Sequence, residues 1–382
     1  MRKLLTLLGV VLLLAACSSN EESEALKPLD LVKFKPTIKL KKVWTSGAGE
    51  GQDYRYTQFV PDMLDDTIYV ADTEGTVFAY SAEKGKRLWK KKLKAPVSGA
   101  ISAAAGKVFV GTYDAEVIAL NAADGDELWR ATTSSEVLAP PVSNGTIVAA
   151  STIDGRLFAF DAATGNLLWT HDHPVPVLTY RTTAAPVLTD NQVIAAFDNG
   201  QIISLNAGDG SLGWEVRVSQ PKGRTDLERI VDIDGMPILN GAFVYAAAYQ
   251  GSVVAIARGT GRVLWSQDAS TYLRLAVGGG NVYVVTEDDS VIAYNAATGS
   301  VTWKNEQLLR RNLSAPAVIG DYVAAIDEEG YMHVLSQSDG SFAVRLNPPG
   351  NKFRSPLVSF QDTLYVLSDN GKLSAYRIAP KK

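Results

Sequence analysis

The chain has 382 residues, 46% of them hydrophobic, which is enough apolar material for one large folded domain. Its formal net charge is −4, and removal of residues 1–16 would take away Arg2 and Lys3, leaving 35 basic against 41 acidic side chains, or −6. This mildly acidic balance argues against a nucleic-acid partner, and the single cysteine excludes a disulfide within one copy.

Residues 1–16 have the pattern of an export signal. A charged start precedes an apolar stretch, residues 4–14, that is too short to span a bilayer. The small residues before Cys17 resemble the bacterial lipobox, in which the cysteine is diacylated and becomes the mature N-terminus. We therefore expect a removed signal peptide, a lipidated Cys17 and a flexible tether over residues 17–40. Ser18 after the cysteine resembles the pattern of lipoproteins exported to the outer membrane, so we expect a lipid anchor on its periplasmic face.

The rest of the chain repeats a unit of about 40 residues. Six of the seven tryptophans end the phrase Gly-x-x-x-Trp. In the clearest copy, residues 155–161 alternate as a strand does, residues 161–165 have turn chemistry, and residues 166–169 return as a second strand. Two shorter runs upstream bring each unit to four antiparallel strands. Because one such sheet cannot bury both faces, we predict an all-β architecture of radially stacked sheets, a β-propeller.

We assign the tryptophans a structural role. One Trp can bury roughly 150–250 Å², so one per unit at a fixed offset would dock each blade on the next. The residues concerned are Trp44, Trp89, Trp129, Trp169, Trp214, Trp265 and Trp303.

The apolar anchors of the third strands indicate eight units. They are Tyr80, Leu120, Phe160, Leu205, Ile256, Tyr294, Leu335 and Tyr376. The seventh unit has Val344 in place of a Trp, and the eighth has no fourth strand of its own. Trp44, conversely, lies in a fourth strand with no unit before it. We therefore predict an eight-bladed ring over residues 41–382, closed by the N-terminal strand completing the last blade; a seven-bladed ring is the alternative.

The phrase Ala-x-x-x-Gly-x-x-x-Trp resembles the repeat of the pyrroloquinoline-quinone (PQQ) propeller family. Joined to a lipobox and a tether, it resembles the BamB family of lipoproteins from the outer-membrane β-barrel assembly (BAM) machinery. Residues 178–181 and 228–234 are similar to the family's surface for BamA, the central barrel subunit, and its periplasmic POTRA domains. The resemblance implies partner-binding roles for five residues, of which Tyr180 departs from the family's usual aliphatic residue. The five are Leu178, Tyr180, Arg181, Asp232 and Asp234.

The spacing of the tryptophans points to the same two segments. From Trp89 onward the intervals are 40, 40, 45, 51 and 38 residues, so the excess lies in the two units that contain these segments. Insertions in repeat proteins map to loops, often on the binding face. The longest insertion, residues 219–229, is highly charged and ends in Arg229, which joins the candidate partner-binding residues. Ordinary solvated loops are the alternative.

The resemblance implies a non-catalytic scaffold, without cofactor or metal, that binds BamA and supports the folding and insertion of outer-membrane proteins. Unfolded outer-membrane proteins are a further candidate partner, contacted through strand edges. One alternative is a quinone-dependent dehydrogenase, but such enzymes carry an adjacent cysteine pair, which a chain with Cys17 alone cannot form. A ligand- or glycan-binding propeller is another.

Two smaller features receive structural interpretations. His171 and His173 have the spacing of metal ligands, but two ligands do not make a site. The basic run at residues 90–94 is interpreted as a solvated blade rim, with attraction to an anionic membrane surface as the alternative.

Overall fold

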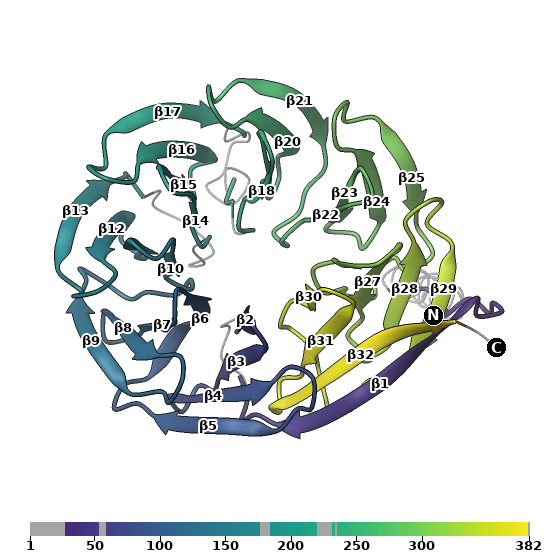
Figure 1. The fold of residues 1–382 in the computed structure, drawn as a ribbon. Helices are drawn as coiled ribbons and strands as arrows, with labels where there is room; N and C mark the ends of the chain where they lie inside the picture. The colour runs from purple at the N-terminus through teal and green to yellow at the C-terminus, as the bar shows by residue number, and fades with distance from the viewer. Residues whose placement is uncertain (1–26, 53–58, 176–183, 220–230, 234, 381–382) are drawn as a thin grey trace, which may run out of the picture.

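Eight four-stranded antiparallel sheets surround a central axis in the computed structural model, which describes residues 27–52, 59–175, 184–219, 231–233 and 235–380 (Figure 1). The predicted eight-bladed propeller is confirmed, and the seven-bladed alternative is wrong. The first strand of each blade lies nearest the axis and the fourth forms the rim (Figure 1). Within the described residues, no helix has the length and apolar character needed to cross a membrane.

Blades are numbered in chain order. Blades 1 to 4 comprise β2 (Asp62–Leu64), β3 (Thr67–Ala71), β4 (Thr76–Ser81) and β5 (Arg87–Lys92); β6 (Val97–Ala104), β7 (Lys107–Thr112), β8 (Glu116–Asn121) and β9 (Glu127–Thr132); β10 (Val142–Ser143), β11 (Ile147–Ser151), β12 (Arg156–Asp161) and β13 (Leu167–Asp172); and β14 (Val187–Leu188), β15 (Gln192–Ala196), β16 (Gln201–Asn206) and β17 (Leu212–Arg217). Blades 5 to 8 comprise β18 (Ile238–Asn240), β19 (Phe243–Ala247), β20 (Ser252–Ala257) and β21 (Val263–Asp268); β22 (Ala276–Gly278), β23 (Asn281–Val285), β24 (Val291–Asn295) and β25 (Val301–Asn305); β26 (Ala317–Ile319), β27 (Tyr322–Ile326), β28 (Met332–Ser336) and β29 (Phe342–Leu346); and β30 (Val358–Phe360), β31 (Thr363–Leu367), β32 (Lys372–Pro380) and β1 (Ile38–Gly47).

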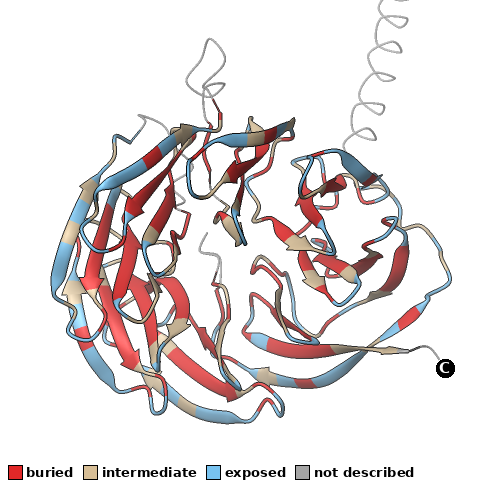
Figure 2. Ribbon diagram, turned by 45° about the horizontal axis from the view of Figure 1, so that its top comes forward, coloured by how far each residue is buried: buried red, intermediate tan, exposed pale blue. Residues whose placement is uncertain are grey.

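The core lies between the blades, in the two middle strands of each. Every residue of β11 is buried, and β12 is buried except at its ends, because both faces of these strands meet a neighbouring blade. This explains their nearly continuous apolar and small residues. The rim strand β13 is mostly exposed. Figure 2 shows the same division, with buried residues inside and exposed residues on the rim.

The Gly-x-x-x-Trp phrase joins consecutive blades. The indole of Trp129 donates from Nε1 to the carbonyl of Ala162 in the next blade, at 3.1 Å. Its ring lies over Gly165, where an added Cβ would sit 2.7 Å from the indole and where φ is +73°. Each glycine of the phrase therefore packs against the Trp ring of the preceding unit. The same hydrogen bond joins Trp44 to Ala82, Trp89 to Ala122, Trp169 to Ala207, Trp214 to Arg258, Trp265 to Ala296 and Trp303 to Gln337.

The N-terminal strand closes the ring, as predicted. β1 pairs with β32 in antiparallel register from Ile38 opposite Pro380 to Gly47 opposite Lys372. Blade 8 therefore takes its third and fourth strands from opposite ends of the chain and has no turn between them. A Trp at position 344 would have no such turn to cover, which accounts for Val344 in the seventh unit.

Residues 27–37, which we call the strap, lie along the outer edge of blade 7 (Figure 1). The Thr37 amide donates to the Ala343 carbonyl at 2.9 Å, and Phe34 stacks on Phe342 with ring centroids 5.2 Å apart. The strap and the start of β1 thus occupy part of the segment expected to be a flexible tether, residues 17–40. That expectation is wrong from residue 27 onward, because this stretch has specific partners in blade 7.

Two arginines clamp the strap through its backbone carbonyls. Arg311 donates to the Leu29 carbonyl at 2.8 Å, and Arg345 donates to the Val32 carbonyl at 2.9 Å. The Arg345 guanidinium also lies 5.2 Å from the centroid of the Phe34 ring, a cation–π contact. The two arginines hold successive points of the strap.

A buried polar network supports both arginines. Arg311 Nε donates to Asp327 Oδ2 at 2.7 Å, and both side chains are almost fully buried (3% and 0% exposed). His333 shares the same carboxylate oxygen at 2.9 Å, and its Nδ1 accepts from Arg345 Nε at 3.0 Å. This arrangement requires a neutral His333 that donates from Nε2. The network joins the between-blade connection, a hairpin and the rim strand of blade 7 to the strap.

Candidate partner-binding surface

One face of the ring carries both segments singled out in the sequence. Because the strands of a blade are antiparallel, hairpins between second and third strands lie on the same face as the connections between blades; we call it the connection face. The segments belong to the connections from β13 to β14 and from β17 to β18. Their described ends bond to hairpins of this face: the His173 amide to the Gly155 carbonyl at 3.0 Å and the Val218 amide to the Gly200 carbonyl at 2.8 Å.

Most of the predicted partner-binding residues lie outside the described residues. They are Leu178, Tyr180, Arg181, Arg229 and Asp234, and Cys17 also lies outside them. Asp232 is described and is only 1% exposed. Its carbonyl accepts a hydrogen bond from the Tyr249 amide at 2.9 Å.

The neighbours of Asp232 anchor the second segment. Ile233 is fully buried in the cluster between blades 4 and 5 together with Trp214, and Val231 is 2% exposed. With 1% exposure, Asp232 presents almost no surface to a partner in this conformation. Its contribution to binding would therefore act through the shape of the segment.

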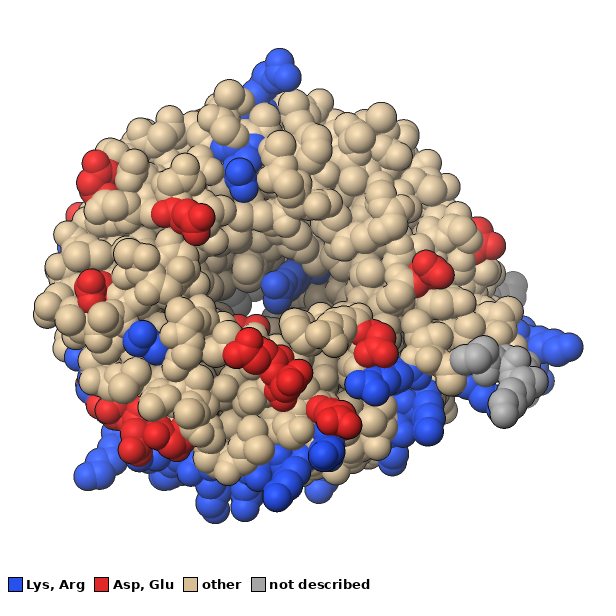
Figure 3. All heavy atoms as spheres, viewed as in Figure 1, with Lys and Arg blue, Asp and Glu red and all other residues tan. Residues whose placement is uncertain are grey.

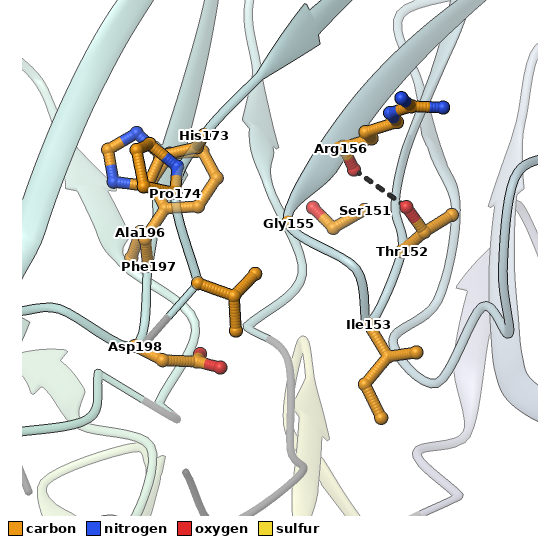
Figure 4. Close-up of a pocket in the computed structure, with 11 residues that line it drawn as sticks. Ser151, Thr152, Ile153, Gly155, Arg156, His173, Pro174, Ala196, Phe197 and Asp198 are labelled. Atoms are coloured by element: carbon orange, nitrogen blue, oxygen red, sulfur yellow. Dashed lines mark hydrogen bonds between the residues drawn. The ribbon is translucent and has the colours of Figure 1, made fainter. Parts of the chain in front are cut away.

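The first segment leaves blade 3 through a fixed histidine. The ring of His173 stacks on Phe197 of blade 4, with centroids 3.9 Å apart (Figure 4). His173 Nε2 lies 2.7 Å from the Asn199 amide nitrogen, which fits a neutral imidazole accepting from the amide. Burial lowers the pKa of His173, in agreement with this role. The start of the segment is thus held across the junction of blades 3 and 4.

A small cavity lies beside His173 at this junction (Figure 4). Thr152, Ile153, Val175 and Asp198 contribute to its lining, and its volume is about 20 Å³. That is room for about one water molecule. Within the described parts of the chain, no three His, Cys, Asp or Glu side chains gather as a metal site would require. The stacked His173 and Phe197 rings and this small cavity belong to the packing of blade 3 on blade 4.

The structure adds a group of polar and aromatic residues that sequence reasoning missed. Tyr249, beside Asp232, donates from its hydroxyl to Glu287 Oε1 at 3.3 Å, and Ser270 Oγ donates to Glu287 Oε2 at 3.0 Å. Tyr272 is 40% exposed on the same connection face. Burial raises the pKa of Tyr272, and nearby Asp289 and Glu287 raise it further. Partly exposed tyrosines are typical of protein interfaces. In the sequence, Tyr249 follows the second strand of blade 5 and Tyr272 precedes the first strand of blade 6. That both residues lie on one face becomes visible only in the assembled ring.

Relatives in sequence cover nearly the whole chain. The family model described as outer membrane protein assembly factor BamB matches residues 41–125, 73–305 and 288–381. BamB of Pseudomonas aeruginosa is 48% identical over 372 residues, which are 97% of this chain and 98% of that protein. BamB of Vibrio cholerae is 33% identical, with 97% and 96% covered.

Solved structures agree with the fold and distinguish the families. The crystal structure of BamB from Moraxella catarrhalis superposes with a TM-score of 0.81 at 26% identity, covering 89% of this chain and all of that one. Quinohemoprotein alcohol dehydrogenase from Comamonas testosteroni has a TM-score of 0.71 at 13% identity, covering 90% of this chain and 77% of that one, and shares the fold alone. The chain therefore belongs to the BamB family of outer membrane protein assembly factors, not to the dehydrogenases that share its propeller.

Proposed function

We propose that this protein is a lipid-anchored scaffold on the periplasmic face of the outer membrane that binds the POTRA domains of BamA. On this proposal Cys17 carries the anchor and the connection face of blades 3 to 5 meets the partner. The protein performs no chemistry of its own. It acts by holding the barrel subunit within the assembly complex and thereby supports the folding and insertion of outer-membrane proteins.

One observation carries the proposal: both candidate segments leave and re-enter a rigid ring on the same face. His173 fixes the start of the first segment and Ile233 fixes the end of the second. Binding groups presented by a rigid scaffold lose less conformational entropy on association than groups on a free loop. Tyr249 and Tyr272 extend the same surface toward blade 6 with aromatic groups.

Calorimetric titration of the mature chain with the POTRA domains of BamA tests this surface. We expect saturable binding by the parent and a loss of more than about 1 kcal/mol for Arg181→Ala and for the double variant Asp232→Asn/Asp234→Asn. Asparagine at position 232 keeps the shape of a buried side chain. Asp114→Ala is the control, because Asp114 is exposed in the hairpin between β7 and β8 of blade 2, on the same connection face as the two segments.

The outcome is read only from variants whose thermal unfolding matches that of the parent. Binding that survives both substitutions would place the contact elsewhere on the ring. Absence of binding by a well-folded parent would refute the scaffold proposal itself.

A second role, contact with unfolded outer-membrane proteins, is favoured by the rim strands. Each is hydrogen-bonded within its blade on one side only, and several expose aliphatic side chains: Leu88 (54%), Leu128 (47%), Leu167 (56%), Leu212 (56%) and Val301 (56%). An extended chain can add to such an edge through its backbone. Photo-crosslinkers at Leu167 and Leu212 should capture nascent barrel proteins in cells, whereas a crosslinker at buried Leu205 should not. Equal labelling at all three positions would count against edge binding.

A further inference from the structure

The rim of blades 8 and 1 is strongly basic although the protein as a whole is acidic. Residues 33–47 and 84–94 contain lysines and one arginine but no aspartate or glutamate. All of these basic residues are exposed except Lys91, which is half-buried. We call this surface the basic rim. It consists of Lys33, Lys35, Lys39, Lys41, Lys42, Lys84, Lys86, Arg87, Lys90, Lys91, Lys92 and Lys94.

The fold brings the two stretches together. β1 is the rim strand of blade 8 and β5 is the rim strand of blade 1, and they follow one another along the same edge of the ring (Figure 1). Ser46 Oγ donates to the Gly85 carbonyl at 2.6 Å, and the Trp44 ring lies over the same glycine. Lys and Arg side chains gather along this edge in Figure 3. The basic rim is therefore one continuous surface.

The architecture does not require this charge. The rim strands of blades 2, 4 and 5 carry a glutamate or an aspartate at an exposed position: Glu127 in β9, Glu215 in β17 and Asp268 in β21. Propeller packing therefore tolerates either sign on the rim.

Little of the positive charge is neutralised locally. Among the described residues, the ion pairs of the basic rim are Lys91 with Asp126 at 2.7 Å and Lys92 with Glu74 at 3.9 Å. Its other lysines have no carboxylate within ion-pairing distance in the described part of the chain. Clustered like charges repel one another and raise the local positive potential, which favours an external anionic partner.

The strap sets where the tether leaves the ring. Arg310 Nε donates to the Lys27 carbonyl at 2.7 Å, and the Leu29 amide donates to the Leu309 carbonyl at 3.1 Å. Residue 27 is thus fixed at the connection between blades 6 and 7, and the strap leads from there to Lys33, the first residue of the basic rim. Ten peptide units separate Cys17 from Lys27 (27 − 17), and a fully extended chain of that length spans at most about 35 Å. A lipid on Cys17 would keep this edge near the membrane.

We propose that the basic rim contacts the anionic headgroups of the membrane to which the protein is tethered. This inference rests on the proposed lipid anchor, because the short tether is what favours a membrane over an acidic protein as the occupant. Lysines close to an anionic bilayer are attracted electrostatically, and this attraction adds to the hold of the acyl chains. The ring would then stand with the edge of blades 8 and 1 toward the bilayer, and its connection face would remain open to a partner.

Co-sedimentation of the unlipidated mature chain with vesicles tests the contact apart from the anchor. We expect binding to phosphatidylcholine vesicles that contain phosphatidylglycerol, none to phosphatidylcholine alone, and weakening as salt rises, because the Debye length falls from about 10 Å at 0.1 M to 3 Å at 1 M. Lys39→Glu/Lys41→Glu should reduce binding by about tenfold or more. Arg262→Glu/Lys304→Glu, which changes net charge equally on blades 5 and 6, should have little effect.

Each outcome has a defined meaning. Equal binding to both vesicle types, no binding to either, or an equal loss in the two charge-reversed variants would overturn the proposal. If the Lys39/Lys41 variant instead loses affinity for the POTRA domains while vesicle binding is unchanged, the basic rim is a protein contact. Titration with the POTRA domains is a separate measurement, so failure of the scaffold proposal leaves the vesicle result readable.

Discussion

Replacing Trp129 with alanine is expected to lower the free energy of unfolding by about 3–5 kcal/mol, the range for deleting a large buried aromatic side chain. Trp129 is 8% exposed and packs between blades 2 and 3, with its ring 6.0 Å from Phe109 and 6.5 Å from Phe160. The substitution also removes the hydrogen bond to the Ala162 carbonyl and uncovers Gly165. Denaturant unfolding followed by circular dichroism measures the change.

The adjacent Leu128 provides the matched control. It lies on the same rim strand but is 47% exposed, so Leu128→Ala should change stability by no more than about 0.5 kcal/mol. Trp129→Phe should fall between the two, because it keeps an aromatic ring and loses the indole hydrogen bond, worth about 1 kcal/mol. Equal effects of Trp129→Ala and Leu128→Ala would show that the Trp is not a blade-docking residue.

The ring itself could be predicted because its determinants are local and repeated. The turn at residues 161–165, the alternation before it and the Trp after it recur often enough to identify strand, hairpin and blade. What the repeat does not reveal is that Gly165 packs against the ring of Trp129 rather than that of Trp169. That pairing depends on the stacking of one blade on the next, which no single unit encodes.

The strap was missed because its composition resembles that of a tether. Lysines and two prolines between residues 27 and 37 gave no strand signal, and the partners Arg311 and Arg345 lie about 300 positions away in sequence. Their role appears only after β1 brings the N-terminus to blade 8. Long-range closure of this kind follows from the fold and not from local pattern.

The candidate site was located by its insertions, whereas the role of Asp232 could not be assigned from residue type. A charged residue in a long loop suggests a surface contact, yet Asp232 is buried, and its neighbour Ile233 packs in the cluster between blades 4 and 5. The alternation of apolar and polar residues around it was visible in the sequence. Whether such alternation marks a buried anchor depends on the neighbouring blade.

Arg311→Met is expected to destabilise the protein by about 3 kcal/mol and to release the strap. The substitution leaves Asp327, which is fully buried, without its guanidinium partner, and removal of one member of a buried ion pair typically costs 3–5 kcal/mol. The lower end applies because Asp327 retains hydrogen bonds from His333 and the Tyr331 amide. Denaturant unfolding measures the loss of stability, and faster hydrogen exchange at the Leu29 amide would show that the strap is released.

Glu329→Gln is the control within the same network. Glu329 also pairs with Arg311, but its side chain is 57% exposed, and surface ion pairs contribute about 0–1 kcal/mol. Loss of this ion pair should leave both the free energy of unfolding and the hydrogen exchange at the Leu29 amide nearly unchanged. A large effect of Glu329→Gln, or unchanged exchange at Leu29 in Arg311→Met, would contradict a clamp built on the buried pair.

Lowering the pH should reduce the difference in the free energy of unfolding between the parent and Arg311→Met. Burial lowers the pKa of His333 below its ordinary value of 6.5; Asp327 acts to raise this pKa, and the positive charges of Arg345 and Arg311 act to lower it. A depressed pKa means that the stability from neutral His333 is present above about pH 6.5 and is lost as pH falls through the pKa of the folded state. Without Arg311 that pKa rises toward its ordinary value, so the variant loses less stability between pH 7 and pH 5 than the parent does. If the free energy of unfolding of the two proteins changes with pH in parallel, His333 is not part of the clamp.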